Sequence, residues 1–570
     1  MSSFFTIPSS QKKRKRPGSS EIPKKRFATT KPLKSTPRKP QRDESISGSE
    51  DDSEDGARPV FQDEGDAAST SGSEREDGEE TAAERRLRLA ERYLENIREE
   101  VDEVGFDAEE IDRDLIAERL KEDVAESKGR MYRALASELS FEDAEKSWFK
   151  CNTETFTSVA TCAPWAYTVS KDLCLVKWRI QELARDQWPQ KKKKMKKLPP
   201  PPRKKPVQVA FVRGDKKKAK DNSYRGHVDS ILTVAASQDG KFVVTGGRDR
   251  RIVVWDAENL KPLRVFHQHR DAVTGLAFRR GTNQLYSASK DRTIKIWSLD
   301  ELAYVETLFG HQDEVVDVAA LAQEHCISVG ARDRTARLWK VVEETQLVFR
   351  GGGGSKKLGP RVHEGSMDRV AMIDEEMFIT GSDNGSLSLW IMHKKKPIFT
   401  LPLTHGMDPP VAAEEASAEQ HPDQSIIPEP QPRWITALAT IPYSDVILSG
   451  SWDGHVRAWR VSDDKKKIEP VGIVGGSSIV ATNAISGQVD GNARSAEEAA
   501  PVVKGVINDI SVFERGDRGK DGVCIVIAVG KEHRLGRWKK LEAKNGGVVF
   551  EIPRIDNPKT NGVAASDDDE

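Results

Sequence analysis

Cysteine is scarce in this chain. Its 570 residues include five, with no CxxC pair: Cys151, Cys162, Cys174, Cys326 and Cys524. Structural zinc sites are usually built from closely spaced Cys and His ligands, so we expect no metal site, and nothing else in the sequence implies a cofactor. The low count also favours a reducing compartment over a secreted domain held together by disulfides.

Long apolar runs and catalytic motifs are also missing. No stretch of 18 apolar residues occurs, and the N-terminus lacks an apolar signal-peptide core, so we expect neither secretion nor membrane spanning. Neither HExxH nor GxSxG is present. The glycine run 351–354 does not have the order of a phosphate-binding loop, and we interpret it as a flexible connection. We therefore expect a protein that is not an enzyme.

Charge is abundant but segregated, although the net charge is only −1. Residues 12–42 are basic, residues 43–80 are acidic, and residues 191–220 are basic again. Like-charged blocks with few aromatic residues are typical of disordered tails and loops. We predict a disordered tail over residues 1–80 and an acidic tail over residues 556–570.

Residues 81–140 have a different pattern. Apolar residues such as Leu87, Leu94 and Val101 recur at helical spacing, and a second charged amphipathic stretch follows over 108–138. The sequence predicts a short charged helical segment. It either packs on its own domain or docks a partner.

From about residue 150 the pattern changes to short strands and turns, with tryptophans at the ends of apolar runs. They are Trp178, Trp255, Trp297, Trp339, Trp390, Trp459 and Trp538. Three of them are 42 residues apart, which is the period of a four-stranded propeller blade. We predict an all-β, seven-bladed WD-repeat β-propeller over residues 150–555, with a basic insert at 187–222 and a disordered insert at 405–433. The last strand of the ring could come from Gly547–Ile552 or from residues 141–150.

A polar set precedes each tryptophan. It is complete in two predicted blades, which contain His227, Thr245, Asp249 and Trp255, and His269, Ser287, Asp291 and Trp297. In blade four Val329 stands at the Ser/Thr position, and we expect blades four, six and seven to lack members of the set. His, Ser and Asp together resemble a hydrolase triad, but a catalytic site occurs once, whereas this set repeats. We interpret it as a structural hydrogen-bond network.

Basic residues flank the acid in several of these turns. Those before it are Lys171, Arg248, Lys290, Arg332 and Lys531, and those after it include Arg250, Arg292 and Arg334. Equivalent turns of a propeller lie on one face, so these eight side chains are candidates for RNA binding. Two alternatives remain open: the charges are simply solvated, or the lysine insert binds the polyanion instead.

Two basic clusters lie in the N-terminal tail. They comprise Lys12, Lys13, Arg14, Lys15 and Arg16, followed by Lys24, Lys25 and Arg26. This spacing predicts a bipartite nuclear localisation signal, with a general nucleic-acid-binding tail as the alternative.

The chain also resembles a known family, the U3 small nucleolar RNA-associated WD-repeat proteins. The similarity rests on the helical stretch beginning YLENIREEVDEVGF, on blades such as GHVDSILTVAASQDGKFVVTGGRDRRIVVW, and on the GSMDRV stretch. The resemblance implies a non-catalytic scaffold of the nucleolus that binds the box B/C region of U3 snoRNA. It also implies partners among box C/D snoRNP proteins, including a kink-turn-binding protein, and other small-subunit processome proteins that act in pre-rRNA processing and 18S rRNA maturation.

Two other functions remain possible from the sequence: a substrate receptor of a cullin ubiquitin ligase and a chromatin-associated scaffold. The receptors often carry WDxR, whereas here Trp255–Asp256 continues with Ala257 and Glu258. A histone reader would favour an acidic face, whereas the predicted ring is basic.

The two basic clusters give a first prediction. Deletion of residues 1–30 from a fluorescent fusion should leave the protein largely cytoplasmic, because import receptors recognise exposed paired basic clusters. The fraction of nuclear fluorescence measures the effect. Undiminished nucleolar signal would contradict the prediction for a protein that does not enter with a partner.

Overall fold

The computed structural model describes residues 120, 132–151, 153–187, 201–221, 223–351, 365–409, 430–476, 501–516 and 519–555. The chain divides into two units, residues 1–90 and 91–570, and every described residue belongs to the second. The proposed nuclear localisation residues, the predicted helix at 82–104 and the tail at 556–570 lie outside the described residues. No helix in the described part is long and apolar enough to cross a bilayer.

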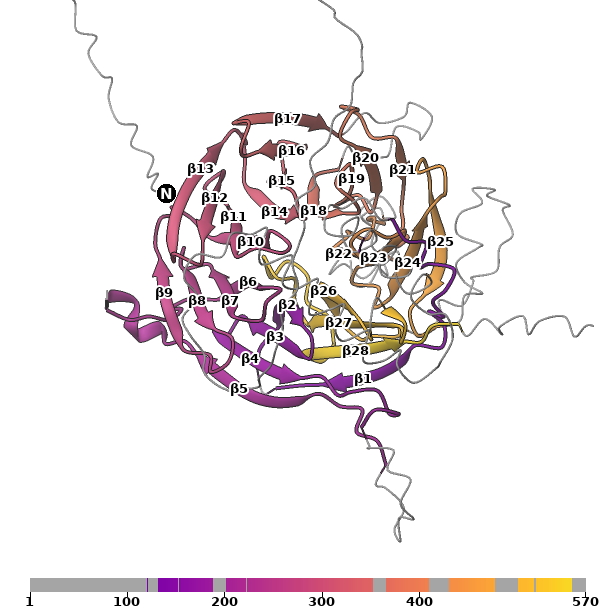
Figure 1. Ribbon diagram of the computed structural model, residues 1–570, viewed down its shortest axis with the longest axis horizontal. Helices are drawn as coiled ribbons and strands as arrows, with labels where there is room; N and C mark the ends of the chain where they lie inside the picture. Colours follow the sequence, from indigo (N-terminus) through magenta and orange to yellow (C-terminus); the bar gives the residue numbers. More distant parts are fainter. Residues whose placement is uncertain are drawn as a thin grey trace, which may run out of the picture. The chain divides into compact units, whose positions relative to one another are not determined.

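The strands form seven four-stranded antiparallel sheets arranged around a ring (Figure 1), which confirms the predicted seven-bladed propeller. Blade one comprises β2 (Phe156–Cys162), β3 (Trp165–Ser170), β4 (Cys174–Arg179) and β5 (Val207–Arg213). Blade two comprises β6 (Ile231–Ala236), β7 (Phe242–Gly247), β8 (Ile252–Asp256) and β9 (Pro262–Phe266). Blade three comprises β10 (Val273–Phe278), β11 (Gln284–Ser289), β12 (Thr293–Ser298) and β13 (Ala303–Phe309).

The remaining blades follow the same order from the centre outward. Blade four comprises β14 (Val315–Ala320), β15 (His325–Gly330), β16 (Thr335–Lys340) and β17 (Thr345–Arg350). Blade five comprises β18 (Met367–Met372), β19 (Met377–Ser382), β20 (Leu387–Ile391) and β21 (Phe399–Leu401). Blade six comprises β22 (Ala437–Thr440), β23 (Val446–Gly450), β24 (Val456–Val461) and β25 (Ile468–Ile473). Blade seven comprises β26 (Val506–Glu514), β27 (Val523–Gly530), β28 (Gly546–Ile552) and β1 (Glu145–Phe149).

The hydrophobic core lies between the blades. Each of the seven blade–blade interfaces contains one apolar cluster among the described residues. Between blades two and three, for example, Val254 packs with Val273 and Trp297, and all three are fully buried. Both faces of a blade are therefore covered, which explains why strands such as β8 are almost continuously apolar.

The repeating polar set forms a hydrogen-bond chain inside the blade. In blade two the His227 ring lies 2.7 Å from the Thr245 hydroxyl through Nε2 and 3.1 Å from the Asp249 carboxylate through Nδ1. Trp255 Nε1 donates to the same Thr245 oxygen at 2.8 Å. His269, Ser287, Asp291 and Trp297 repeat this arrangement in blade three. In both blades this hydrogen-bond chain ties the loop that enters the blade to the turn between its second and third strands.

The expectation for blades four and six is wrong. In blade four His311 and Trp339 both bond to Ser328, one residue before the predicted Val329, because the following turn is one residue longer. In blade six His405 bonds to Ser449 at 2.8 Å and to Asp453 at 2.8 Å. A histidine at the start of the predicted 405–433 insert therefore belongs to the blade. The insert separates it from Ser449, which hides its usual spacing.

Blade seven departs most from the repeat. Its third strand is β28, and its outermost strand is β1 from the other end of the propeller, paired from Glu145↔Glu551 to Phe149↔Gly547. Both closing segments considered from the sequence are thus used together. Trp538 does not end a strand: it lies in the loop between β27 and β28 and is 55% exposed. Phe550, opposite Ile525, occupies the place that Trp255 takes opposite Val243, in the interface with the preceding blade.

Three predicted boundaries also need correction. The propeller begins before residue 150, with β1 at Glu145–Phe149. Residues 132–140 are not helical: Asp445 accepts hydrogen bonds from the backbone of Leu135 and Ala136, and this segment packs against blades six and seven. The basic insert at 187–222 is interrupted, because Val207–Arg213 forms the outer strand of blade one.

Two arginines occupy the centre of the ring. Arg534 donates to the carbonyl oxygens of Thr274 in blade three and Val316 in blade four, at 2.8 and 3.2 Å. Arg369 donates to the carbonyl oxygens of Thr436 in blade six and Asn508 in blade seven. Both side chains are buried, and they satisfy inner-strand carbonyls that face the channel.

The hydrogen-bond chain predicts the effect of removing its acid. Asp291→Ala should lower the free energy of unfolding by about 1–3 kcal/mol, because His269 and the backbone N–H of Arg270 lose their acceptor inside the protein. Chemical denaturation measures the change. The exposed Glu301 of the same blade supplies the control, Glu301→Ala. An unchanged stability in Asp291→Ala would contradict a structural role.

Candidate nucleic-acid interface

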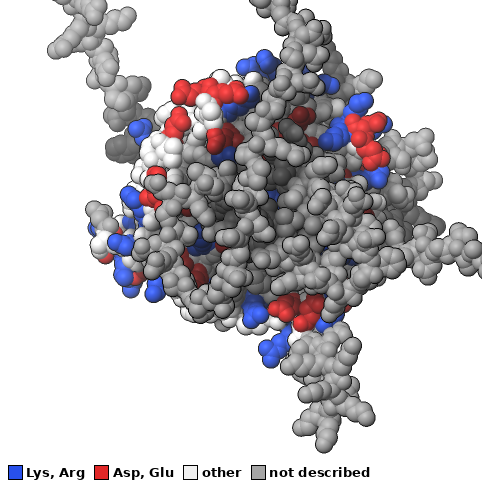
Figure 2. Space-filling model, viewed as in Figure 1, with Lys and Arg blue, Asp and Glu red and all other residues white. Residues whose placement is uncertain are grey.

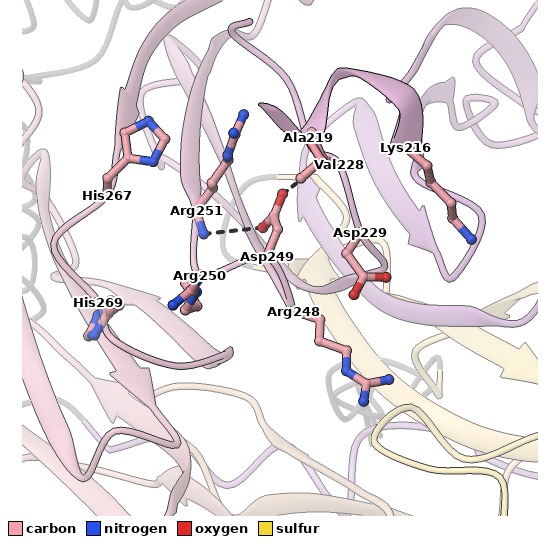
Figure 3. A pocket seen from close by; sticks show the side chains of 10 residues that line it. All are labelled: Lys216, Ala219, Val228, Asp229, Arg248, Asp249, Arg250, Arg251, His267 and His269. Atoms are coloured by element: carbon pink, nitrogen blue, oxygen red, sulfur yellow. Dashed lines mark hydrogen bonds between the residues drawn. The ribbon is translucent and has the colours of Figure 1, made fainter. Parts of the chain in front are cut away.

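Six of the eight candidate RNA-binding side chains lie on turns of blades two, three and four, which the hydrogen-bond chain holds in place. In blade two the Asp249 carboxylate accepts from the backbone N–H groups of Val228 at 2.9 Å and Arg251 at 3.1 Å. Arg250 takes a left-handed conformation, with φ of +65°, which completes the tight turn. Figure 3 shows Asp249 bonded within the turn, with Arg248 and Arg250 extending from it. Arg292 and Arg334 have the same backbone conformation in the next two blades.

The five residues before the acid do not form a uniform ring. Arg248, Arg332 and Lys531 are exposed. Lys290 is half-buried and forms an ion pair of 2.8 Å with Glu314. Lys171 is buried, pairs with Glu532 at 3.1 Å and donates to the Gly536 carbonyl at 3.0 Å. Lys171, one of the predicted RNA-binding candidates, is therefore not available at the surface, because the long loop of blade seven covers it.

The residues after the acid are closer to solvent. Arg250 and Arg292 are exposed, whereas Arg334 is half-buried. By contrast Arg251, the next residue in blade two, is buried and donates to the carbonyl oxygens of Tyr224 and Gly226. Charge at these turns is thus divided between side chains that brace loops and side chains that reach solvent.

The structure places several basic residues around one open pocket of about 710 Å³ at the β7–β8 turn of blade two, beside the loop that leads to blade three (Figure 3). Its lining includes Arg248, Arg250 and Lys216, together with the carboxylates of Asp229 and Asp249. Lys216 begins the short 3-10 helix η1 (Lys216–Lys220), whose four lysines are exposed. In Figure 2 a group of Lys and Arg side chains stands at the left edge, where Figure 1 draws η1.

Burial lowers the pKa of two basic groups on this face. Desolvation, together with the neighbouring Arg251, lowers the pKa of His267 below its ordinary value, so that the imidazole at the pocket is neutral at pH 7. Desolvation also lowers the pKa of Lys171, opposed by its hydrogen bond to Glu532. The permanent positive charge available to a ligand at this pocket therefore comes from arginines and exposed lysines.

Residues that the sequence interpretation missed lie on the same face, over blades six and seven. Trp434, Trp452 and Trp538 come together there, although the sequence pattern predicts Trp538 at the end of a blade strand. One signal was available: the 15-residue interval from Lys531 to Asn545 before β28 is too long for the tight turn of the other blades.

The fold and the repeated hydrogen-bond chain define the class of protein, a WD-repeat β-propeller. The family model "WD domain, G-beta repeat" matches residues 219–256, 260–298, 303–340 and 426–460. Blades one, five and seven fall outside these matches. They are the blades in which the described residues show no His, Ser/Thr, Asp and Trp hydrogen-bond chain; His363, the histidine that precedes blade five in sequence, lies outside the described residues.

Relatives extend the similarity to most of the chain. It is 35% identical to Ribosomal RNA-processing protein 9 of Saccharomyces cerevisiae, covering 82% of this chain and 88% of that protein. It is 36% identical to U3 small nucleolar RNA-interacting protein 2 of Homo sapiens, covering 85% of each. Among solved structures, the WD40 repeats of RRP9 superpose with a TM-score of 0.54 at 29% identity, covering 73% of this chain and all of that one. U3-55K superposes with a TM-score of 0.53 at 30% identity, covering 72% of this chain and all of the other. The chain belongs to the family of U3 snoRNP-associated WD-repeat proteins, as its sequence resemblance indicated.

The position of Lys171 gives a prediction that tests whether this side chain stabilises the loop of blade seven. Lys171→Met should destabilise the propeller by about 1–3 kcal/mol, because the Gly536 carbonyl and Glu532 lose a buried donor. Thermal and chemical denaturation measure this. Lys531 belongs to the same set of candidates but is exposed, so Lys531→Met is the control and should leave stability unchanged. Equal stability of the two variants would show that Lys171 does not brace the loop.

Proposed function

We propose that this chain is a non-catalytic scaffold subunit of the U3 snoRNP and of the small-subunit processome, acting in pre-rRNA processing and 18S rRNA maturation. Family membership over more than four fifths of the chain carries the proposal. The relatives are named for ribosomal RNA processing and for interaction with U3 small nucleolar RNA. A nuclear and nucleolar location follows from that role.

A scaffold fits the chemistry of the repeated polar set better than an enzyme does. Four blades bury the same His, Ser/Thr and Asp side chains, and in each the hydroxyl also bonds to a tryptophan. The histidines are 7% exposed or less, so a substrate has no access to them. The names of the relatives also favour this role over a ubiquitin-ligase receptor or a chromatin scaffold.

For the RNA contact we propose U3 snoRNA, at its box B/C region, with a kink-turn-binding protein and other box C/D snoRNP proteins as neighbours. On this chain the exposed Arg248, Arg250, Arg292 and Arg332 and the exposed Lys531 supply positive charge on one face. Arginine can bind a phosphate through two parallel hydrogen bonds, which suits contact with the RNA backbone. Crosslinking the protein in nuclear extract and sequencing the bound RNA tests the identity of the RNA.

Charge reversal tests the face itself. Arg248→Glu with Arg332→Glu should weaken binding to U3 snoRNA and flatten the dependence of log affinity on log salt by about 0.7–0.9 per lost phosphate contact. Affinity across a salt series measures both. Lys241→Glu with Lys261→Glu is the matched control. Both lysines are exposed on turns of blade two that lie at the other end of its strands from the turn that carries Arg248.

Deletion of residues 191–205 tests the rival site, the lysine insert. The proposal for the arginines is wrong when only this deletion lowers RNA affinity and the double reversal leaves both affinity and salt dependence unchanged. The turns would then be assigned to protein docking.

A further inference from the structure

Three tryptophans from separate segments meet beside the basic turns. Trp434 precedes β22, Trp452 lies in the turn between β23 and β24, and Trp538 lies in the loop between β27 and β28. The ring centroids of Trp434 and Trp452 are 5.8 Å apart, and those of Trp434 and Trp538 are 5.5 Å apart. Trp434 and Trp452 are half-buried, but Trp538 is 55% exposed. The cluster therefore presents one large aromatic surface to solvent.

The position of Trp538 is built into the loop. A Cβ atom placed on Gly536 would lie 1.8 Å from Cζ3 of the Trp538 ring, so only glycine at this position lets the ring lie against the backbone. The buried His533 ring lies on another side, with centroids 4.8 Å apart. Burial and the adjacent Arg534 hold the pKa of His533 well below its ordinary value, so that it contacts Trp538 as a neutral ring. Trp538 is thus supported from behind while much of it faces solvent.

Asp408 joins the other members of the cluster. Its carboxylate accepts from Trp452 Nε1 at 2.8 Å and from Arg433 Nε at 3.2 Å, and it also pairs with Lys539. The Lys539 ammonium lies 4.1 Å from the centre of the Trp452 ring. Burial alone would raise the pKa of Asp408, but these hydrogen bonds lower it and keep the carboxylate ionised. These contacts hold the three tryptophans in place before any partner binds, so we call Trp434, Trp452 and Trp538 together the aromatic platform.

The surroundings of Trp538 are basic. Exposed side chains in the same loop include Lys531, Arg537, Lys540 and Lys544. Of the two acids in the loop, Glu532 is already paired with Lys171 and Arg537, and Glu542 is the other. An exposed indole surrounded by cations complements a ligand with a π face and attached negative charges. An unpaired nucleotide has both, whereas an apolar or basic peptide would leave the cations without partners.

We propose that Trp538 stacks on an unpaired nucleobase of the bound RNA, while the exposed lysines and arginine of its loop contact the flanking phosphates. The inference rests on the proposed RNA-binding function. It adds a second site, over blades six and seven, where the protein would contact a base instead of the RNA backbone alone. Stacking on an aromatic side chain contributes about 1–3 kcal/mol per base. Such a contact requires a base that is not paired, so it selects single-stranded or bulged positions over a continuous duplex.

Substitution of the ring tests the proposal. Trp538→Ala should weaken binding to in vitro transcribed U3 snoRNA by about 5-fold to 150-fold, the equivalent of one lost stack. The salt dependence should stay unchanged, because no phosphate contact is removed. Trp538→Phe should retain much of the affinity, whereas Gly536→Ala should reproduce the loss by displacing the ring. The matched control is Phe309→Ala, an aromatic residue 71% exposed on the outer strand β13.

A direct readout accompanies the affinities. U3 snoRNA substituted with 4-thiouridine should crosslink to the peptide that contains Trp538, and melting temperatures should show that Trp538→Ala remains folded, as expected for an exposed side chain. Unchanged affinity in folded Trp538→Ala, with no crosslink, would overturn the stacking contact. Weakened binding by the Arg248 and Arg332 reversal in the same assay would leave the RNA-binding function intact.

Two other outcomes also count against the proposal. If Trp538→Ala binds RNA normally but is lost from assembled particles, the platform docks a protein. If the unaltered chain itself does not bind U3 snoRNA, the proposed RNA contact fails and the stacking site fails with it.

Discussion

The pairing of β1 with β28 is the constraint on which the rest of the propeller depends. The ring of blades is closed because segments from the two ends of the propeller meet in one sheet, where Glu145–Phe149 forms the outer strand of blade seven beside β28. The inner strands then face a common channel, where Arg534 and Arg369 bridge blades three, four, six and seven through backbone carbonyls. Closure therefore fixes the angular position of every turn, and with it the spacing of the exposed cations.

Local repeats made the fold predictable, and interruptions of the repeat limited the detail. Trp255, Trp297 and Trp339 are equally spaced in the sequence because each fills the equivalent position in one of three successive interfaces between blades. The period fails for His405, which is separated from Ser449 by the insert, and for Ser328, which a longer turn displaces by one residue. The period gives a wrong prediction at Trp538, because a single tryptophan does not show whether the residues before it form a strand. The spacing of tryptophans therefore identifies the blades, but only the assembled sheet shows which residue completes each polar set.

The candidate interface was less predictable for a related reason. Sequence can place Lys171 and Arg248 at equivalent turns, but exposure depends on what neighbouring blades bring to each turn. Blade seven covers Lys171 with its own loop, whereas nothing comparable among the described residues covers Arg248. The same loop carries Trp538, so the contact that removes one cation from the ring also supports the aromatic platform. Equivalent positions in a repeat protein thus acquire different roles through contacts between repeats.

The two kinds of side chain on this face would contribute in different ways to the proposed RNA recognition. Phosphate contacts orient an RNA but carry little information about its bases, and they weaken as salt rises. An aromatic surface contacts the base itself and is insensitive to that screening, but it needs an unpaired base brought close to it. On this propeller the arginine turns of blades two to four lie on the same face as the tryptophans of blades six and seven. A folded RNA held by its backbone over the first set could therefore present an unpaired base to the second. In that arrangement the charges would hold any RNA backbone, and the stacked base would add affinity only for RNAs whose unpaired position lies at the right distance.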